Sequence, residues 1–421
     1  MYLMHFTITL KSKIILVFIL FISSFAFSQE ENKDSAKDSI PYITLYDLFK
    51  KKENRVDEAE SLTNFIILPT IGLQPASGFT GGFISQYSFK ENEEDKVSLI
   101  AGGASYSTKK QILTYLKNNM YLKDDTYFLS GDIRYYVFSQ SNYGLGSDIV
   151  PYGDAFDDFN YEAIEEPMKY NYFKFHQTAN YKIIPNVYAG LGIHIDSYDS
   201  IEDELLDVAN AELTEHYNYS QAYGYNDEHY TVAGGSVNLI YDSRDNLINT
   251  NSGLFVNLSY RFNPELSSSQ QNSTTLTLDS RYFIPLSTKN KQHVLGFWTY
   301  GQFLTSGNLP YLNLPAIGWD QNSRSGKGYT QGLFRGANLI TFETEYRFPI
   351  MKNQLISGTV FANATSASDV EGNLNLFHTF QPAIGVGLRI LLDKNTLTNF
   401  VMNFGLGRDS KTFYFNDGEG F

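Results

Sequence analysis

The sequence predicts an all-β protein, a transmembrane antiparallel β-barrel of about sixteen strands that follows a short N-terminal periplasmic tether. Three observations support this prediction. Apolar and polar residues alternate along many short segments, as they do in strands that have one lipid face and one water face. The part of the chain after residue 64 contains no long apolar run. Aromatic residues make up 15% of the chain, which suits lipid-facing strands and interfacial girdles.

The first 28 residues have the pattern of a secretory signal peptide. Lys11 and Lys13 precede an apolar run from Ile14 to Phe27, and Ala26-Phe27-Ser28 offers small residues for cleavage. The run is shorter than the roughly 20 apolar residues of a membrane-spanning helix. The chain has no cysteine, so it can carry neither a disulfide nor the acylated cysteine of a lipoprotein. We therefore expect an exported protein that is held in the outer membrane of a Gram-negative cell by its own fold.

Residues 29–63 are polar and rich in charge, with one short amphipathic stretch at 42–49. This composition favours a flexible periplasmic segment with at most one short helix.

Residues 64–421 are expected to form the barrel. The alternation places strands at 64–73, 79–90, 95–107, 110–122, 125–139, 168–184, 186–200, 228–242, 251–264, 272–286, 290–305, 336–349, 353–364, 379–393, 397–408 and 411–421. The longest connections all follow odd-numbered strands, as the external loops of a transmembrane barrel do. An even number of strands also puts both termini on the periplasmic side.

The segment 339–348 shows the alternation clearly. Phe342, Tyr346 and Phe348 fall on one face, and Glu343 and Glu345 fall on the other. Charges on one side of a strand are costly in an apolar core but not in a polar lumen.

Composition and motifs argue against several other functions. The net charge of −14 argues against a nucleic-acid partner, because phosphate contacts need clustered Lys and Arg. The seven histidines are scattered without metal-ligand spacing, and no catalytic motif stands out. We therefore expect no enzymatic activity, no cofactor and no resident metal. Two acidic loops, 148–166 and 199–215, either bind calcium or are simply solvated.

A series of short motifs carries a family resemblance. They are Leu68-Pro69-Thr70-Ile71-Gly72, Tyr241-Asp242-Ser243-Arg244-Asp245, Gly326-Lys327-Gly328-Tyr329, Phe334-Arg335-Gly336, Glu345-Tyr346-Arg347-Phe348-Pro349 and the ending Gly407-Arg408-Asp409 to Phe421. In this order and spacing they make the chain resemble the BamA/TamA family of outer-membrane assembly barrels, the bacterial surface antigen family. The family has sixteen strands.

The resemblance implies a loop that folds back into the lumen, where an arginine pairs with acidic groups of the wall. Lys327 stands at that position, and lysine keeps the charge but loses the planar fork. The candidate loop lock consists of Lys327, Gly328 and Tyr329 with Glu343 and Glu345 as partners. The alternative is that Lys327 is a solvated loop residue.

The last strand resembles the assembly signal that the barrel-insertion machinery recognises. Phe413, Phe415 and the final Phe421 share one parity, and we expect them on one face of the strand. The structural alternative is that Phe421 is only a girdle residue.

The resemblance also implies a function in outer-membrane protein assembly or translocation. Residues 29–63 are too few for one periplasmic repeat of the family, so an accessory or reduced member is expected. Expected partners are outer-membrane lipid and lipopolysaccharide, the insertion machinery during biogenesis, and client outer-membrane proteins. The alternatives are a passive channel for small solutes, and a surface receptor or barrel-embedded enzyme.

Overall fold

The computed structural model describes residues 43–48, 62–74, 78–92, 94–149, 161–266, 271–287, 292–369, 371–394, 396–417 and 421. They belong to the compact unit Pro41–Phe421. The predicted signal peptide, residues 1–28, and most of the predicted flexible segment, residues 29–63, lie outside these residues.

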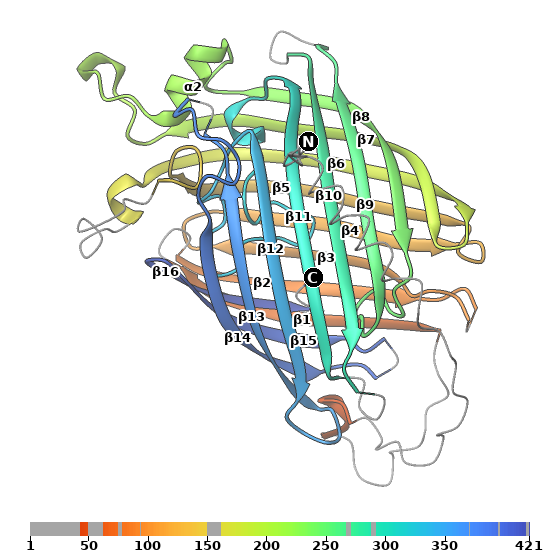
Figure 1. Cartoon of the computed structure of the whole chain (residues 1–421). Coiled ribbons are helices and arrows are strands. Elements are labelled where there is room, and N and C mark those ends of the chain that lie inside the picture. Colours follow the sequence, from red (N-terminus) through yellow and green to blue (C-terminus); the bar gives the residue numbers. More distant parts are fainter. Residues whose placement is uncertain are drawn as a thin grey trace, which may run out of the picture. The chain divides into compact units, whose positions relative to one another are not determined.

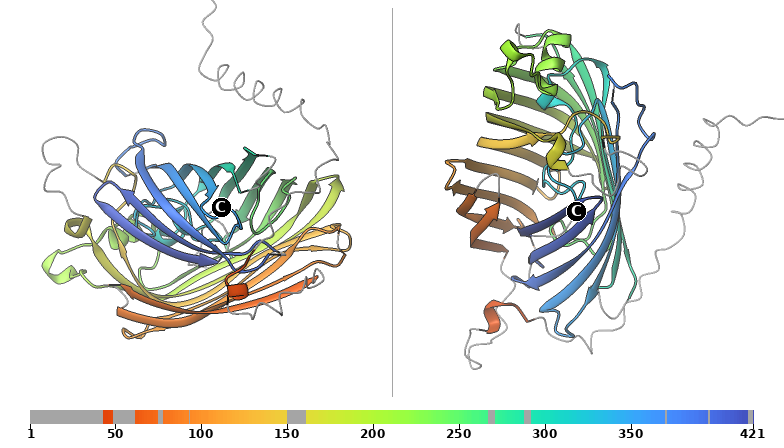
Figure 2. Two further views of the ribbon diagram at one scale, coloured as in Figure 1. Left: turned by 90° about the horizontal axis from the view of Figure 1, so that it is seen from below. Right: turned by 90° about the vertical axis from the view of Figure 1, so that its left-hand side faces the viewer.

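One antiparallel sheet of sixteen strands, in simple chain order, curls into a barrel (Figures 1 and 2). The strands are β1 (Thr63–Gln74), β2 (Gly78–Phe89), β3 (Ser98–Ser107), β4 (Ile112–Leu122), β5 (Tyr127–Asn142), β6 (Glu166–Ile184), β7 (Val187–Asp203), β8 (Tyr230–Asp242), β9 (Gly253–Asn263), β10 (Ser273–Pro285), β11 (Val294–Gly307), β12 (Asn338–Pro349), β13 (Ile356–Ala367), β14 (Gln381–Leu391), β15 (Asn399–Gly407) and β16 (Ser410–Asp417).

This architecture confirms the predicted fold class and strand number. The largest differences in bounds are the start of β11, at Val294 rather than 290, and the end of β16, at Asp417 rather than 421. β11 begins at Val294, which pairs with Pro285 at the end of β10. The last pair of the β15–β16 ladder in the described residues is Phe400 with Asp417.

The short helices lie before β1 and in the longer connections. They are η2 (Tyr46–Leu48), η5 (Tyr161–Ile164), η6 (Val208–Asn210), α2 (Glu215–Tyr223) and η7 (Tyr311–Asn313). The three longest connections follow β5, β7 and β11, all on one end of the barrel, as the sequence predicts. Among the described helices, none has the length and apolar character needed to cross a membrane.

The predicted two faces of the strands are present. In β12, Thr341, Glu343, Glu345 and Arg347 are buried inside the barrel, whereas Phe342 is exposed on its outside. β7 shows the same division, because Ile193 is 62% exposed and its neighbour His194 is buried. Apolar side chains thus face outwards, as the alternation predicts for a barrel with a lipid-facing surface.

At the end of the barrel with short connections, the β8–β9 turn contacts the β14–β15 turn. The turn between β8 and β9 is shaped by Arg244, whose Nη2 donates to Asp242 Oδ2 at 2.7 Å and whose guanidinium lies 4.2 Å from the Phe255 ring centroid. Asn246 and Asn249 of this turn donate to backbone carbonyls of the β14–β15 turn.

The segment before β1 contacts the same end of the barrel. The Ile43 N–H donates to the Asn353 carbonyl at 3.2 Å, and the Leu45 N–H donates to the Leu391 carbonyl at 2.8 Å. Backbone hydrogen bonds therefore attach this segment to β14 and to the β12–β13 turn.

The outward face of β7 generates a test of the membrane assignment. Replacing Ile193 with Arg puts a charge on the lipid face and should cost about 2–4 kcal/mol of unfolding free energy. Urea unfolding of the refolded protein in lipid vesicles measures this loss. Ile193→Ala, which adds no charge, is the matched control, and an equal loss in both variants would contradict a lipid-facing position.

Candidate functional site

The connection between β11 and β12, residues 308–337, enters the lumen; we call it the lumen loop. Its residues Lys327, Tyr329 and Phe334 are each no more than 1% exposed. A loop on a water-facing surface would leave such side chains open, so these residues are packed against the inner wall.

Lys327 occupies a buried cluster of charges on the lumen face of β12. Its Nζ lies 2.5 Å from Glu343 Oε1 and 3.3 Å from Glu345 Oε2. Two arginines also contact Glu345. Arg347 Nε lies 2.7 Å from Glu345 Oε1, and Arg389 Nη2 lies 2.9 Å from the same oxygen. Because all these charges are removed from water, each depends on its partners for compensation.

Gly328 brings the lumen loop against β14 and β15. Its φ of 105° is a conformation that L side chains rarely adopt, and a Cβ there would lie 2.6 Å from the Ala383 Cβ. Its N–H donates to Thr412 Oγ1 of β16 at 3.1 Å. Close approach of the backbone therefore requires glycine at this position.

Tyr329 extends these contacts to β14, β16 and the turn between β15 and β16. Its hydroxyl donates to the Pro382 carbonyl at 2.6 Å and accepts from the Arg408 N–H at 3.0 Å, while its own carbonyl accepts from the Tyr414 hydroxyl at 3.0 Å. Burial raises the pKa of Tyr329, so the hydroxyl stays neutral and able to donate. Together, Lys327, Gly328 and Tyr329 join β12 to β16 through one loop.

The lumen loop also reaches the opposite wall. Arg134 of β5 donates to the carbonyls of Asp320 and Gln321 at 2.9 Å and 3.0 Å. Arg335 folds the base of the loop by donating to the carbonyls of Tyr311 and Leu312. The loop therefore spans the lumen from β5 to β16.

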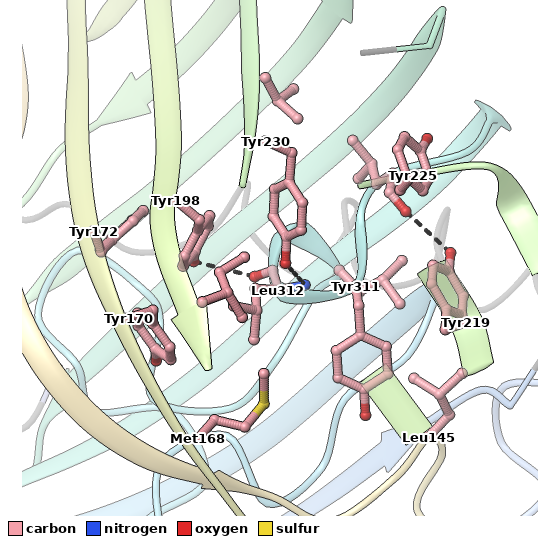
Figure 3. Packing of buried hydrophobic residues seen from close by; sticks show 14 residues of the cluster. Leu145, Met168, Tyr170, Tyr172, Tyr198, Tyr219, Tyr225, Tyr230, Tyr311 and Leu312 are labelled. Atoms are coloured by element: carbon pink, nitrogen blue, oxygen red, sulfur yellow. Dashed lines mark hydrogen bonds between the residues drawn. The ribbon is translucent and has the colours of Figure 1, made fainter. Parts of the chain in front are cut away.

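Tyrosines cover the first part of the lumen loop at the end with long connections (Figure 3). The Tyr198 hydroxyl donates to the Leu312 carbonyl at 3.2 Å, and the Leu312 N–H donates to the Tyr230 hydroxyl at 3.1 Å. Tyr219 of α2 donates to the Leu309 carbonyl at 3.0 Å. Tyr198, Tyr219 and Tyr230 thus form a tyrosine roof over the first part of the loop.

A cavity of about 330 Å³ remains between the lumen loop and the β8–β9 turn. Its wall is polar and carries positively and negatively charged side chains. Lys117, His176, Arg261 and Asp279 are among the lining residues. No group of His, Cys, Asp or Glu in the described residues is arranged to hold a metal ion.

The structure confirms the predicted position of the loop lock but not that of the last phenylalanine. Lys327 contacts Glu343 and Glu345 inside the lumen, so the solvated alternative for Lys327 is wrong. Gly328 and Tyr329 contact β16 and β14 rather than the two glutamates.

The expected common face of the three C-terminal phenylalanines is also wrong. Phe413 and Phe415 point outwards and are 69% and 62% exposed, but Phe421 lies inside the lumen and is 6% exposed. Alternation applies only within the strand, and β16 ends at Asp417. A girdle residue would lie on the outer surface of the barrel, so the buried position of Phe421 in the lumen also excludes the girdle alternative.

Sequence reasoning missed several partners of the loop. Arg389 reaches Glu345 from β14, and Asn363 of β13 donates to the Lys327 carbonyl at 2.7 Å. Arg389 was an available signal, because it follows the small residues Ala383, Gly385 and Gly387 on the same face of β14.

Comparison with known proteins adds a family match. Residues 168–421 match the model of the Omp85 superfamily domain. No curated protein sequence matches the chain.

Two solved structures share the fold. BamA from Haemophilus ducreyi lacking POTRA domains 1-3 has a TM-score of 0.53 at 13% identity, over 85% of this chain and 70% of that chain. CdiB from Acinetobacter baumannii has a TM-score of 0.50 at 12% identity, over 86% of this chain and 60% of that chain. At these identities the similarity concerns the fold alone.

The buried charge cluster generates a test of the loop lock. Lys327→Ala should leave Glu343 buried without its cation and lower the unfolding free energy by about 3–5 kcal/mol. Cleavage of the lumen loop by added protease should accelerate in parallel. Lys327→Arg keeps the charge and should stay near the parent. In Lys327→Ala/Glu343→Gln the orphan charge is gone, and part of the stability should return. Unchanged melting and protease resistance in Lys327→Ala would remove the lock.

Proposed function

Because the chain belongs to the Omp85 superfamily, whose model it matches over residues 168–421, we propose that this outer-membrane barrel assembles or translocates outer-membrane proteins as an accessory or reduced member. The proposal assigns the chain no enzymatic activity. Outer-membrane lipid and lipopolysaccharide surround its lipid face, client outer-membrane proteins are its substrates, and the barrel-insertion machinery handles it during biogenesis.

One observation carries the proposal: the seam between the first and last strands. The sheet order begins at β1 and ends at β16, and in the described part of the chain no ladder joins these two strands (Figure 2, orange and dark blue). An unpaired strand edge presents N–H and C=O groups, which cost several kcal/mol each when left unsatisfied in lipid. A strand from another chain satisfies them by adding to the edge.

The two sides of the seam are held differently. On the β16 side, Gly328 and Tyr329 connect the lumen loop to Thr412 and Tyr414. On the other side, Gln86 of β2 donates to Thr398 Oγ1 of the β14–β15 turn at 2.8 Å, across the seam. We infer that β16 stays in place when the seam widens, because the lumen loop holds it. The seam then widens by movement of β1 and β2, after the hydrogen bond between Gln86 and Thr398 breaks.

The loop that crosses the lumen supports this function over a passive channel. The lumen loop crosses the barrel from Arg134 to Thr412, and the tyrosine roof lies over it. A solute pore needs a continuous water path, which packed side chains obstruct.

Photocrosslinking at the seam tests the proposed function. A photoreactive residue at Ile71 of β1 or Phe413 of β16 should capture a client barrel protein during its insertion into vesicles that contain this protein. The matched control is Leu258, which also points outwards but lies in β9, a strand paired on both sides. Capture at Ile71 or Phe413 but not at Leu258 is expected. Equal capture at all three positions, or capture at none, would contradict a role of the seam.

A further inference from the structure

The polar cavity between the lumen loop and the β8–β9 turn differs in charge from the chain as a whole. Its volume of about 330 Å³ lies within the range of small-molecule pockets in proteins, roughly 300–1,000 Å³. The cations that line it are Lys117, Lys174, Arg244, Arg261, Arg281 and Arg324. The lining carboxylates are fewer and belong to Asp132, Asp279 and Asp320. Positive charge therefore collects at this cavity, although the net charge of the chain is −14.

Most of these cations have a carboxylate partner in the wall. The ion pairs are Arg244 with Asp242, Arg261 with Asp196, Arg281 with Asp279 and Lys174 with Asp132, at distances of 2.6 to 2.8 Å. Asp132 has a second partner, because Arg134 Nε lies 2.8 Å from its Oδ1. The single charge of Asp132 is therefore compensated by two cations.

Lys117 of β4 adds a third cation beside this carboxylate. It lies opposite Asp132 in the ladder of β4 and β5. Among the described residues it has no carboxylate within ion-pair distance, and its Nζ lies 4.7 Å from the Tyr115 ring centroid. A half-buried cation opposite an already compensated carboxylate favours an anion that is not part of the wall.

Three neutral side chains that line the cavity have hydrogen-bonding atoms without a partner among the described residues. These atoms are His194 Nδ1 of β7, Asn238 Nδ2 of β8 and Asn257 Oδ1 of β9. The His194 and Asn238 side chains are buried, because the two residues are only 7% and 6% exposed. Buried polar groups are nearly always hydrogen-bonded, so a molecule with its own donors and acceptors suits these positions.

The lumen loop forms another side of the same cavity. Trp319 of the loop lines it, and the Trp319 Nε1–H has no hydrogen-bond partner among the described residues. Two residues further along, Gln321 Nε2 donates to the Gly131 carbonyl of β5 at 3.0 Å. A molecule in the cavity therefore contacts both the loop and the barrel wall.

We propose that this cavity binds a small organic anion that carries hydroxyl groups, of the chemical class of the sugar phosphates. Lys117 and Lys174 compensate the charge of the anion, and its hydroxyl groups bond to His194, Asn238 and Asn257. Contact with the lumen loop means that the bound anion also holds the loop against the wall. The inference does not rest on the proposed function, because it concerns a solute and not a client protein.

Isothermal titration calorimetry tests the anion site, with glucose 6-phosphate as the probe and the full chain refolded in detergent at low salt. Lys117→Met keeps a long side chain without the charge and should weaken binding about ten-fold. Asp132 retains two cations in this variant, so folding should be preserved. Lys169→Met is the matched control, because Lys169 also lies in the wall but is exposed and paired with Glu204.

The results expected are saturable binding to the parent and to Lys169→Met, weakened binding to Lys117→Met, and no binding of neutral glucose. Heat-modifiable gel mobility shows that each variant is folded. Absence of binding to the parent, or equal affinity of the parent and folded Lys117→Met, would overturn the proposal. Equal affinity for glucose and glucose 6-phosphate would overturn the anionic class of the ligand.

Asn238→Ala tests recognition of the hydroxyl groups and keeps the proposal testable if Lys117→Met does not fold. This variant should weaken binding of glucose 6-phosphate but not that of inorganic phosphate, which lacks the sugar. Equal weakening of both probes, or of neither, would overturn the assignment of the neutral polar wall to the ligand.

Protease cleavage of the lumen loop tests the contact between ligand and loop. At about ten times its dissociation constant, glucose 6-phosphate should slow cleavage of the parent about ten-fold, because an open loop leaves the site incomplete. The same concentration should have little effect on Lys117→Met. An unchanged cleavage rate in the saturated parent would show that the anion does not hold the loop.

Discussion

The ion cluster around Lys327 is the interaction on which the interior of this barrel depends. Glu343 and Glu345 are 4% and 1% exposed, in a place where an uncompensated carboxylate is very costly. Lys327 of the lumen loop compensates the charge of Glu343. The charge of Glu345 is compensated by Lys327 together with Arg347 of β12 and Arg389 of β14. The buried glutamates of β12 therefore depend on Lys327 for their counter-charge, and Lys327 depends on them in the same way.

The pairing of Lys327 with the wall also links the lumen loop to the seam between β1 and β16. With Lys327 in place, Gly328 and Tyr329 contact β14, β15 and β16, and the last strand gains contacts inside the barrel that do not require pairing with β1. A strand edge that is supported from the lumen remains ordered while its outer hydrogen-bonding groups stay available. The interior thus supplies stability to the last strand, and under the proposed function its edge receives a client strand.

Much of the barrel follows from periodicity in the sequence, because one side of each strand meets lipid and the other meets the lumen. The same reasoning put Glu343 and Glu345 on the lumen face, since residues two apart in a strand share a face. The family resemblance, and not the periodicity, put Lys327 beside them. The periodicity missed Arg389, because that contact depends on how β12, β13 and β14 align. It misplaced Phe421, because alternation carries no information beyond the end of a strand. The tyrosine roof was also missed, since loop packing follows side-chain shape rather than a repeat.

Single-channel conductance in a planar bilayer tests the central claim, that the lumen loop fills the barrel and supports the seam. The comparison is between the parent protein and a variant in which residues 309–336 are replaced by a turn of about four Gly and Ser residues. The account predicts a small, irregular conductance for the parent and a large, steady one for the variant. A large, steady conductance of the parent itself would contradict it and show that the protein is an open pore.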